Sequence, residues 1–277
     1  MGKGLQVIEP AGLWLGEKML LKRDCFFDAA GANRPLHIWL PDDYGSSEER
    51  YPVMYFFDGH NLYRDEDATY GKCWGLADFL SGWDKKIICV GMECGHGDGE
   101  RLSEYMPFRA YRGAFSKYEP RGDITMQWVI NTVKPLIDRE YRTMPFRECT
   151  GIAGSSMGGL MSVYAVSHYN RWFSKAGCIS SAMGFCAPLV FRDMNESTID
   201  PDTRAFLSWG TLETRGLENP WEEDRGSPTY RRNKAVANKI TDRGGVARLY
   251  CQVGGQHCEA DWEKQLPLFM PFLWQNR

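Results

Sequence analysis

The chain has 277 residues, of which 43% are apolar and 25% are charged, and its formal net charge is −3 at pH 7. That apolar fraction is enough for a large core, and the composition excludes a disordered chain. The small negative charge gives no electrostatic basis for binding nucleic acid or an anionic membrane. We therefore expect one domain, residues 1–277, that acts on a small-molecule ligand.

Nine cysteines are scattered along the chain, and no two of them have the CxxC spacing. The first ten residues contain no apolar segment typical of a signal peptide, and no apolar run approaches the roughly 20 residues of a membrane span. We therefore expect a cytoplasmic protein with reduced thiols. An exported protein with a few disulfides is the alternative.

Short apolar runs bounded by turn residues recur along the chain. Residues 19–27 and 35–41 are strand-like and flank a turn-rich segment, which predicts an antiparallel hairpin. Further runs are apolar at nearly every position, as is typical of strands that helices cover on both faces. These runs are 52–59, 87–92, 149–155, 176–182, 205–211 and 247–255.

Helical patterns lie between these runs, at 123–141, 158–169, 229–245 and 260–275. In the first of them, Asp123 fits an N-cap and Pro135 predicts a kink or a break. The alternation indicates an α/β fold with a mostly parallel sheet of about eight strands and helices on both faces. Two stretches, 93–121 and 183–203, are too long for simple connections and are expected to be functional loops.

The segment Gly154-Ser155-Ser156-Met157-Gly158 matches G-x-S-x-G with Ser156 at the centre. Ser155 cannot take that place, because residue 153 is Ala and residue 157 is Met. In this motif a strand turns sharply into a helix and holds the serine at the strand's carboxyl end, where the first helical amides point towards it. Ser156 is therefore the candidate nucleophile. The alternative is a tight turn that merely favours small residues.

Four segments together resemble the esterase D-like (putative esterase) family of α/β-hydrolases. They are 55–63, 151–159, 208–213 and 254–257, within a resemblance that extends over residues 20–275. The resemblance implies an α/β-hydrolase fold and ester hydrolysis without a cofactor. The family includes feruloyl and acetyl-xylan esterases, siderophore esterases, S-formylglutathione hydrolases and mycolyltransferases, and none of the four segments specifies a substrate.

A serine nucleophile needs a base, and in α/β-hydrolases the order along the chain is serine, acid, histidine. Of the five histidines, only His168 and His257 follow Ser156. His168 lies within the helix that starts at the serine, about 18 Å away by helix rise, so it cannot reach the serine. His257 directly follows the last predicted strand and is the candidate base.

The acid should follow the strand that ends near Thr211, because it has to accept the other N–H of the histidine. Glu213 lies there, and its Gly-Thr-x-Glu context is the one that the family resemblance implies. Glu218 is the second choice. Other acidic residues in the interval are expected to face solvent: Asp193, Asp200, Asp202, Glu218 and Glu222.

Backbone amides should hold the oxyanion. One is the amide of Met157, the residue after the nucleophile. The resemblance implies that His60, which follows an Asp-Gly pair, supplies the second. Trp74 and Trp221 are candidates for walls of the substrate pocket, and the segment 100–123, rich in Arg and aromatic residues, is a candidate for its border.

Two other features suggest chemistry that we do not expect. Cys94, His96, Asp98 and Glu100 resemble a metal site, but all four would have to turn towards one ion from a single glycine-rich loop, so we expect no metal. Cys258 adjoins His257, and neighbours in a chain cannot easily form the ion pair of a cysteine nucleophile.

The sequence thus predicts a carboxylesterase that forms an acyl-enzyme on Ser156 and releases it with water. Small acyl groups such as acetyl, or aromatic ones such as feruloyl, are the expected substrates. A thioesterase or acyltransferase with the same triad remains open, as does a non-catalytic carbohydrate-binding or scaffolding protein on the same fold. Homo-oligomerisation is also left open.

Overall fold

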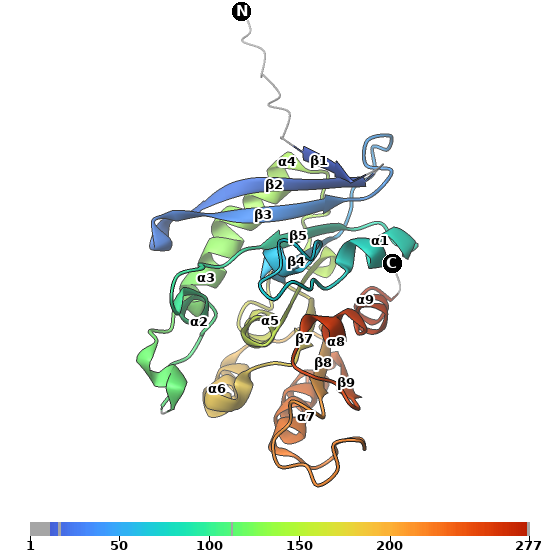
Figure 1. Cartoon of the computed structure of the whole chain (residues 1–277). Helices are drawn as coiled ribbons and strands as arrows, with labels where there is room; N and C mark the ends of the chain where they lie inside the picture. Colours follow the sequence, from blue (N-terminus) through green and yellow to red (C-terminus); the bar gives the residue numbers. More distant parts are fainter. Residues whose placement is uncertain (1–11, 16–17, 112, 276–277) are drawn as a thin grey trace, which may run out of the picture.

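The computed structural model describes residues 12–15, 18–111 and 113–275 (Figure 1). In this part of the chain, nine strands form one sheet in the order β1-β2-β3-β5-β4-β6-β7-β8-β9. The strands are β1 (Gly12–Leu15), β2 (Lys18–Phe27), β3 (Ala32–Leu40), β4 (Val53–Phe57), β5 (Ile88–Met92), β6 (Thr150–Ser155), β7 (Lys175–Ile179), β8 (Arg204–Gly210) and β9 (Val246–Gln252).

The sheet is antiparallel at one end and parallel over the rest. β1, β2 and β3 pair antiparallel, and β3 also pairs antiparallel with β5. From β5 to β9 every neighbouring pair is parallel. The predicted hairpin is β2–β3, and the left-handed Gly31 (φ 62°) follows the short helix η1 (Asp28–Ala30) between the two strands. The mostly parallel sheet predicted from the apolar runs is therefore confirmed.

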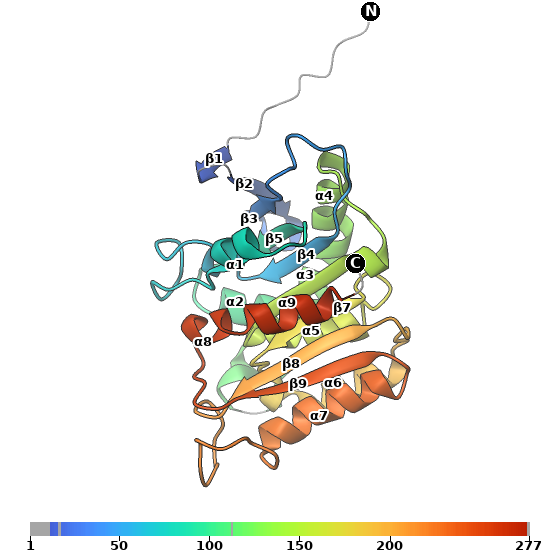
Figure 2. The ribbon, with the colours of Figure 1, turned by 90° about the vertical axis from the view of Figure 1, so that its right-hand side faces the viewer.

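Helices cover both faces of this sheet, as Figure 2 shows. The α-helices are α1 (Leu76–Gly82), α2 (Glu100–Glu104), α3 (Gly122–Trp128), α4 (Lys134–Glu140), α5 (Met157–Ser167), α6 (Ala187–Glu196), α7 (Pro228–Thr241), α8 (Glu259–Glu263) and α9 (Leu266–Leu273). Short helices are η2 (Gly59–Asn61), η3 (Ala114–Lys117), η4 (Val129–Val133), η5 (Arg147–Cys149) and η6 (Met183–Phe185).

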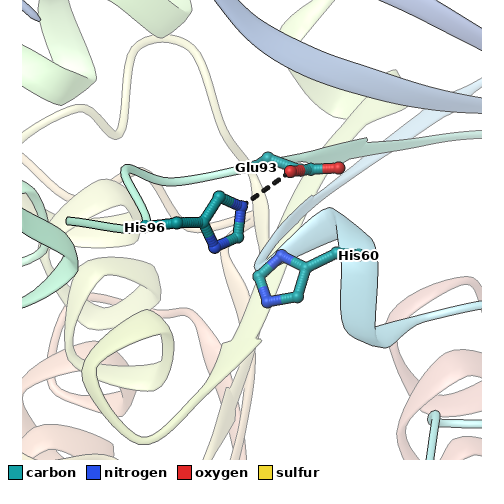
Figure 3. A group of neighbouring side chains, drawn as sticks. All are labelled: His60, Glu93 and His96. Carbon is teal, nitrogen blue, oxygen red and sulfur yellow. Dashed lines mark hydrogen bonds and ion pairs between the residues drawn. The ribbon is translucent and has the colours of Figure 1, made fainter. Parts of the chain in front are cut away.

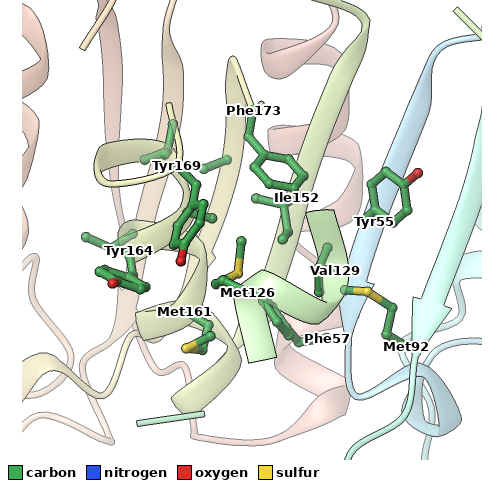
Figure 4. Close-up of a cluster of buried hydrophobic side chains, with 14 of the residues drawn as sticks. Tyr55, Phe57, Met92, Met126, Val129, Ile152, Met161, Tyr164, Tyr169 and Phe173 are labelled. Carbon is green, nitrogen blue, oxygen red and sulfur yellow. The ribbon is translucent and has the colours of Figure 1, made fainter. Parts of the chain in front are cut away.

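The core has two layers because side chains alternate along each strand. Tyr55 and Phe57 of β4 belong to the cluster that α3–α7 cover, and Figure 4 shows where β4 and β6 meet α3 and α5 in it. Phe56, between them, points to the other face, where it joins Trp262 of α8 and Phe269 of α9. Both faces of the sheet are thus buried. A ligand site is therefore expected at the edge where the parallel strands have their carboxyl ends.

The predicted helix over 123–141 is present with the expected irregularity at Pro135. Between α3 and α4 the chain forms one π-helical segment, η4, directly before Lys134 and Pro135. A proline has no N–H and its ring crowds the preceding turn, which accounts for the wider turn there. The predicted N-cap is wrong: Arg121 occupies the N-cap, and the Asp123 carboxylate accepts hydrogen bonds from two tyrosine hydroxyls instead.

Two other boundaries differ from expectation. The stretch 183–203 is not a plain loop, because α6 buries Val190 and Met194 of one helical face against the core. The predicted helix 260–275 consists of two helices, α8 and α9. Among the described residues no helix is long and apolar enough to cross a bilayer. None of the nine cysteines forms a disulfide.

Candidate active site

Ser156 lies at the sharp passage from β6 into α5. Its φ of 57° and ψ of −116° form a backbone conformation that costs a non-glycine residue about 1–3 kcal/mol. Two hydrogen bonds hold it there: the Ser156 N–H donates to the carbonyl of Ile179 (3.0 Å), and the Ser156 carbonyl accepts from the N–H of Ala182 (2.9 Å). The end of β7 and the segment after it therefore fix the serine in the strained position that the G-x-S-x-G motif predicts.

The two glycines of the motif are required by close approach of the backbone. A Cβ atom at Gly154 would lie 2.8 Å from the carbonyl carbon of Gly158. A Cβ atom at Gly158 would lie 3.0 Å from the Cβ of Phe57 and 3.5 Å from a carboxylate oxygen of Asp58. The start of α5 thus packs directly against the end of β4 and the turn that follows it.

His257 and Glu213 are hydrogen-bonded to each other, through Nδ1 of the histidine and Oε2 of the carboxylate. Glu213 follows β8 and His257 follows β9, so adjacent parallel strands bring them to the same edge. An ionised carboxylate only accepts hydrogen bonds, so Nδ1 carries the proton and Nε2 is left with a lone pair. This is the tautomer that a general base requires.

The other oxygen of Glu213 is also fixed. Oε1 accepts from the N–H of Gly210 and from the hydroxyl of Ser180, both at 2.6 Å. Ser180 in turn accepts from the indole N–H of Trp262 (3.1 Å), whose ring lies edge-on to the His257 imidazole with the centroids 5.1 Å apart. Trp262 and Ser180 therefore hold the histidine and the acid in one orientation.

A cavity of about 380 Å³ opens beside this pair. It is lined by Ser180, Ser181, Ala182, Gly184, Trp209, Glu213, Thr214, Thr229, Arg232 and His257. Since Ala182 binds the Ser156 carbonyl, the main chain of the serine lies directly behind one wall of this cavity. Trp209, Thr229 and Arg232 line this cavity and were not predicted as site residues. Trp209 lies in segment 208–213, which was used only for the family resemblance, and α7 carries no motif of its own.

A larger cavity, of about 490 Å³, lies elsewhere. Pro52 and Ile87, which immediately precede β4 and β5, are among its lining residues, so it lies at the amino ends of these strands. Ligands of open α/β sheets bind outside the carboxyl ends of the strands. The smaller cavity, where His257 and Glu213 meet, is therefore the candidate active site.

The two predicted oxyanion donors lie at helix starts. Met157 is the first residue of α5, and the first amides of a helix have no acceptor within it. In η2 the first hydrogen bond runs from the Asn61 N–H to the Asp58 carbonyl (2.9 Å), so the His60 amide precedes the first helical donor. A Cβ atom at Gly158 would come within 3.5 Å of the Asp58 carboxylate, so these two helix starts lie side by side.

A buried ion pair fixes the turn that carries His60. Asp58 has a φ of 59° and is 4% exposed, and its carboxylate accepts from Nε and a terminal nitrogen of Arg101 at 2.6 and 2.7 Å. Burial raises the pKa of Asp58, but the Arg101 guanidinium outweighs burial and the net shift is downward. Arg101, from the segment expected to border the pocket, thus anchors the turn.

The remaining predicted residues lie as follows. Trp74 is 2% exposed and packs in the core, and the centroid of its ring lies 6.0 Å from that of Trp262. It therefore packs behind Trp262 and does not line the cavity. Trp221 is 68% exposed, and its ring lies over Gly254, three residues before His257. It therefore stands at the rim of the loop that carries the histidine.

The acidic residues expected to face solvent do so with one exception. Asp200, Asp202, Glu218 and Glu222 are exposed. Asp193 is not: its side chain is 13% exposed, and its carboxylate binds Nδ1 of His168 at 2.7 Å. His168 lies at the end of α5, as the helix rise predicted.

A second group of titratable side chains lies near the turn that carries His60. In the described part of the chain, His60, Glu93 and His96 bring potential metal-ligand atoms within 4.8 Å of one another (Figure 3). Only His96 belongs to the Cys94–Glu100 run considered from the sequence. The buried Cys94 thiol instead donates to Asp58 at 3.6 Å.

Comparison with known proteins agrees with this geometry. The family model described as "Putative esterase" matches residues 28–273. An uncharacterised protein of Bacillus subtilis, YbbA, is 26% identical over 222 residues, which are 79% of this chain and 82% of that one. Esterase Rv1288 of Mycobacterium tuberculosis is 31% identical over 238 residues, 84% of this chain but only 45% of the mycobacterial protein.

Solved structures share the fold at low sequence identity. An IroE-like serine hydrolase from Shewanella oneidensis has a TM-score of 0.67 at 19% identity, over 88% of this chain and 76% of that one. The enterobactin esterase FES from Shigella flexneri has a TM-score of 0.67 at 17% identity, over 92% of this chain and 58% of that one. A ferulic acid esterase has a TM-score of 0.63 at 16% identity, over 94% and 98%.

These matches confirm the α/β-hydrolase fold, and the family match extends over most of the chain. They also favour an enzyme over the non-catalytic module that the sequence alone left open. The chain belongs to the putative esterase family, and it is a carboxylesterase.

Proposed function

We propose that this carboxylesterase hydrolyses its substrate through Ser156, His257 and Glu213. Nε2 of His257 takes the proton of the Ser156 hydroxyl as its oxygen attacks the ester carbonyl, and then gives that proton to the leaving alcohol. Glu213 stabilises the imidazolium that forms between these two steps. Water repeats the sequence on the acyl-enzyme and releases the acid.

The amides of Met157 and His60 would hold the oxyanion in both steps. Both belong to helix starts that lie side by side, where a Cβ atom at Gly158 would come within 3.5 Å of the Asp58 carboxylate. Preformed donors of this kind need no reorganisation when negative charge develops on the carbonyl oxygen. The Asp58–Arg101 ion pair supports them, because it fixes the turn on which His60 lies.

The cavity favours an acyl group of modest size. Its volume of about 380 Å³ and its lining by Trp209 and Arg232 suit a small or aromatic acyl chain with polar substituents. Ferulic acid, which a structurally similar protein is named for, is of this type. We therefore propose acetyl or feruloyl esters as substrates, with the exposed Trp221 as a wall at the entrance.

The observation that carries the proposal is the fixed His257–Glu213 pair. Its carboxylate has both oxygens hydrogen-bonded, its histidine presents Nε2, and the loop beside it holds the strained Ser156. A histidine–carboxylate pair alone could occur by chance. A serine held at a φ of 57° beside the pair is strained, and such strain is typical of active sites.

Initial rates on p-nitrophenyl acetate, p-nitrophenyl butyrate and methyl ferulate test the proposal. We expect turnover by the wild type, loss of it by about 10⁴-fold or more in Ser156→Ala, and retention of it in Ser155→Ala, which removes the neighbouring hydroxyl. A fluorophosphonate should label the wild type and Ser155→Ala but not Ser156→Ala. Labelling of Ser156→Ala, or its full activity, would contradict Ser156 as the nucleophile.

A further inference from the structure

The group formed by His60, Glu93 and His96 is not used by the proposed triad. His60 comes from η2, after β4, and the other two come from the loop after β5, so two neighbouring parallel strands bring them together. Their potential ligand atoms lie within 4.8 Å of one another. Figure 3 shows one ring nitrogen of His60 turned towards Glu93 and His96.

One ring nitrogen of His60 is hydrogen-bonded and the other is left for a ligand bond. It is 7% exposed, and its Nε2 is hydrogen-bonded to the hydroxyl of Thr69 at 2.9 Å. Its Nδ1 is buried and has no hydrogen-bond partner in the described part of the chain. The tautomer that donates from Nε2 to Thr69 leaves a lone pair on Nδ1, which is the form that binds a metal.

Glu93 is held in the same way. One carboxylate oxygen is hydrogen-bonded to Nε2 of His37 at 2.6 Å, and the His37 side chain is 1% exposed. The other oxygen lies 2.8 Å from Nε2 of His96. Metal-binding histidines and carboxylates generally have such outer hydrogen-bond partners, which fix the ligand and raise its basicity. Thr69 and His37 fill this role for His60 and Glu93.

His96 lies on the solvent-exposed side of the site. Its side chain is 59% exposed, so its ring can rotate, and an ion can enter from solvent. Ligand atoms of tetrahedral zinc are about 3.4 Å apart, given bonds of about 2.1 Å. The Glu93–His96 distance of 2.8 Å and the limit of 4.8 Å for the whole group lie on either side of that spacing, and the exposed His96 is the ligand with room to adjust.

We propose that His60, Glu93 and His96 bind one divalent transition-metal ion, such as zinc, with a fourth position left to water. Two histidines and one glutamate are an established ligand set for zinc. The ion would tie the turn after β4 to the loop after β5. The site does not depend on the proposed triad, because none of its three side chains is a triad member.

The test measures zinc binding to the full chain after treatment with a chelator. Isothermal titration with zinc sulfate should give one site per chain in the wild type. We expect His96→Ala to weaken zinc binding by at least about 100-fold, and Thr69→Val, which removes only an outer partner, by about 10-fold. Both positions are exposed, so neither variant should unfold the protein, and circular dichroism checks this.

His168→Ala is the matched control. His168 is also a surface histidine hydrogen-bonded to a carboxylate, but the described residues offer it no third ligand. We expect this variant to bind zinc as the wild type does. The proposal is overturned if the wild type takes up no zinc, or if His96→Ala and His168→Ala bind it equally.

Discussion

The His257–Glu213 pair and the His168–Asp193 pair look alike but lie in different surroundings. Their histidine side chains are 42% and 47% exposed, and their carboxylates 12% and 13%. In each pair Nδ1 meets the carboxylate. Neither exposure nor the pairing itself therefore distinguishes a catalytic histidine from one at a helix end.

The two pairs differ in the hydrogen bonds to the second carboxylate oxygen and in whether the pair lines a cavity. Oε1 of Glu213 accepts two hydrogen bonds of 2.6 Å, whereas the second oxygen of Asp193 accepts one long bond of 3.4 Å from Ser167. Only the first pair lines a cavity beside the strained serine. Burial raises the pKa of Asp193, and the hydrogen bonds from His168 and Ser167 do not fully offset this effect of burial.

The largest expected effect separates the two histidines. His257→Ala should lower kcat/KM for p-nitrophenyl acetate by about 10⁴-fold or more, because no other group takes the serine proton. His168→Ala should leave it within about twofold, as expected for a surface substitution away from the site. Steady-state kinetics on both variants checks this. Equal losses would mean that His257 acts only through stability.

The second effect concerns the tautomer of the histidine. In Glu213→Gln the amide oxygen should remain with Gly210 and Ser180, which both donate. The NH₂ group then faces Nδ1 of His257 and forces the proton onto Nε2, where it blocks general-base catalysis. We expect kcat to fall by about 10³–10⁴-fold with little change in stability.

Asp193→Asn is the control for that substitution. It makes the same change of acid to amide in the other pair, and kcat should be unchanged. If Glu213→Gln keeps more than a tenth of the activity, the fixed tautomer is not what the carboxylate provides.

Much of this site could be predicted because its signals are local. A strained serine between a buried strand and a helix needs flanking glycines, and these are visible in the sequence. Chain order gave His257 and the interval for the acid, and the Gly-Thr-x-Glu context that the family resemblance implies selected Glu213 over Glu218. The two meet because adjacent parallel strands end at one edge. The apolar runs likewise gave the central strands, since continuous apolarity reports burial on both faces.

Other parts could not be predicted, because they depend on which distant loops meet. Ser180 and Trp262, which orient Glu213 and His257, carry no motif. The potential ligands His60 and Glu93 lie 33 positions apart in the chain and come from different loops, so no local spacing pattern joins them. The missed helix α6 did have a signal, since Pro188 at its start precedes Val190 and Met194 at helical spacing.

A third prediction compares Arg101 with an arginine that has an exposed partner. Arg101→Met should lower the free energy of unfolding at pH 7 by about 3–5 kcal/mol, because it leaves the buried Asp58 carboxylate unpaired. Arg225→Met removes a partner of the exposed Glu223, and the free energy of unfolding should change far less than in Arg101→Met. Urea denaturation of both variants measures the difference.

The pH dependence gives the sign of the Asp58 contribution. The pKa of Asp58 is lower in the folded chain than its ordinary value, so its charged form is favoured by folding. Its stabilisation is complete above the unfolded pKa of about 3.9 and disappears as the pH falls through the folded value. The gap between wild type and Arg101→Met should therefore narrow below about pH 4. A gap that stays constant in acid would assign the loss to packing alone.

The smallest effect is expected at the rim. Trp221 is 68% exposed and touches the loop before His257, so it can contact a bound aromatic acyl group without taking part in the chemistry. Trp221→Ala should raise KM for methyl ferulate about twofold to fivefold, a loss of about 0.5–1 kcal/mol of binding. Its kcat, and its KM for p-nitrophenyl acetate, should change less.

Phe146→Ala is the control for this variant, since Phe146 is 61% exposed and precedes β6 at the opposite end of the strand from Ser156. It should change neither constant. An equal rise of KM for acetate and ferulate in Trp221→Ala would point to a shifted His257 loop. A rise for ferulate alone would identify Trp221 as a wall for the aromatic ring, and the acyl group of the substrate would then lie between Trp221 and the cavity that His257 lines.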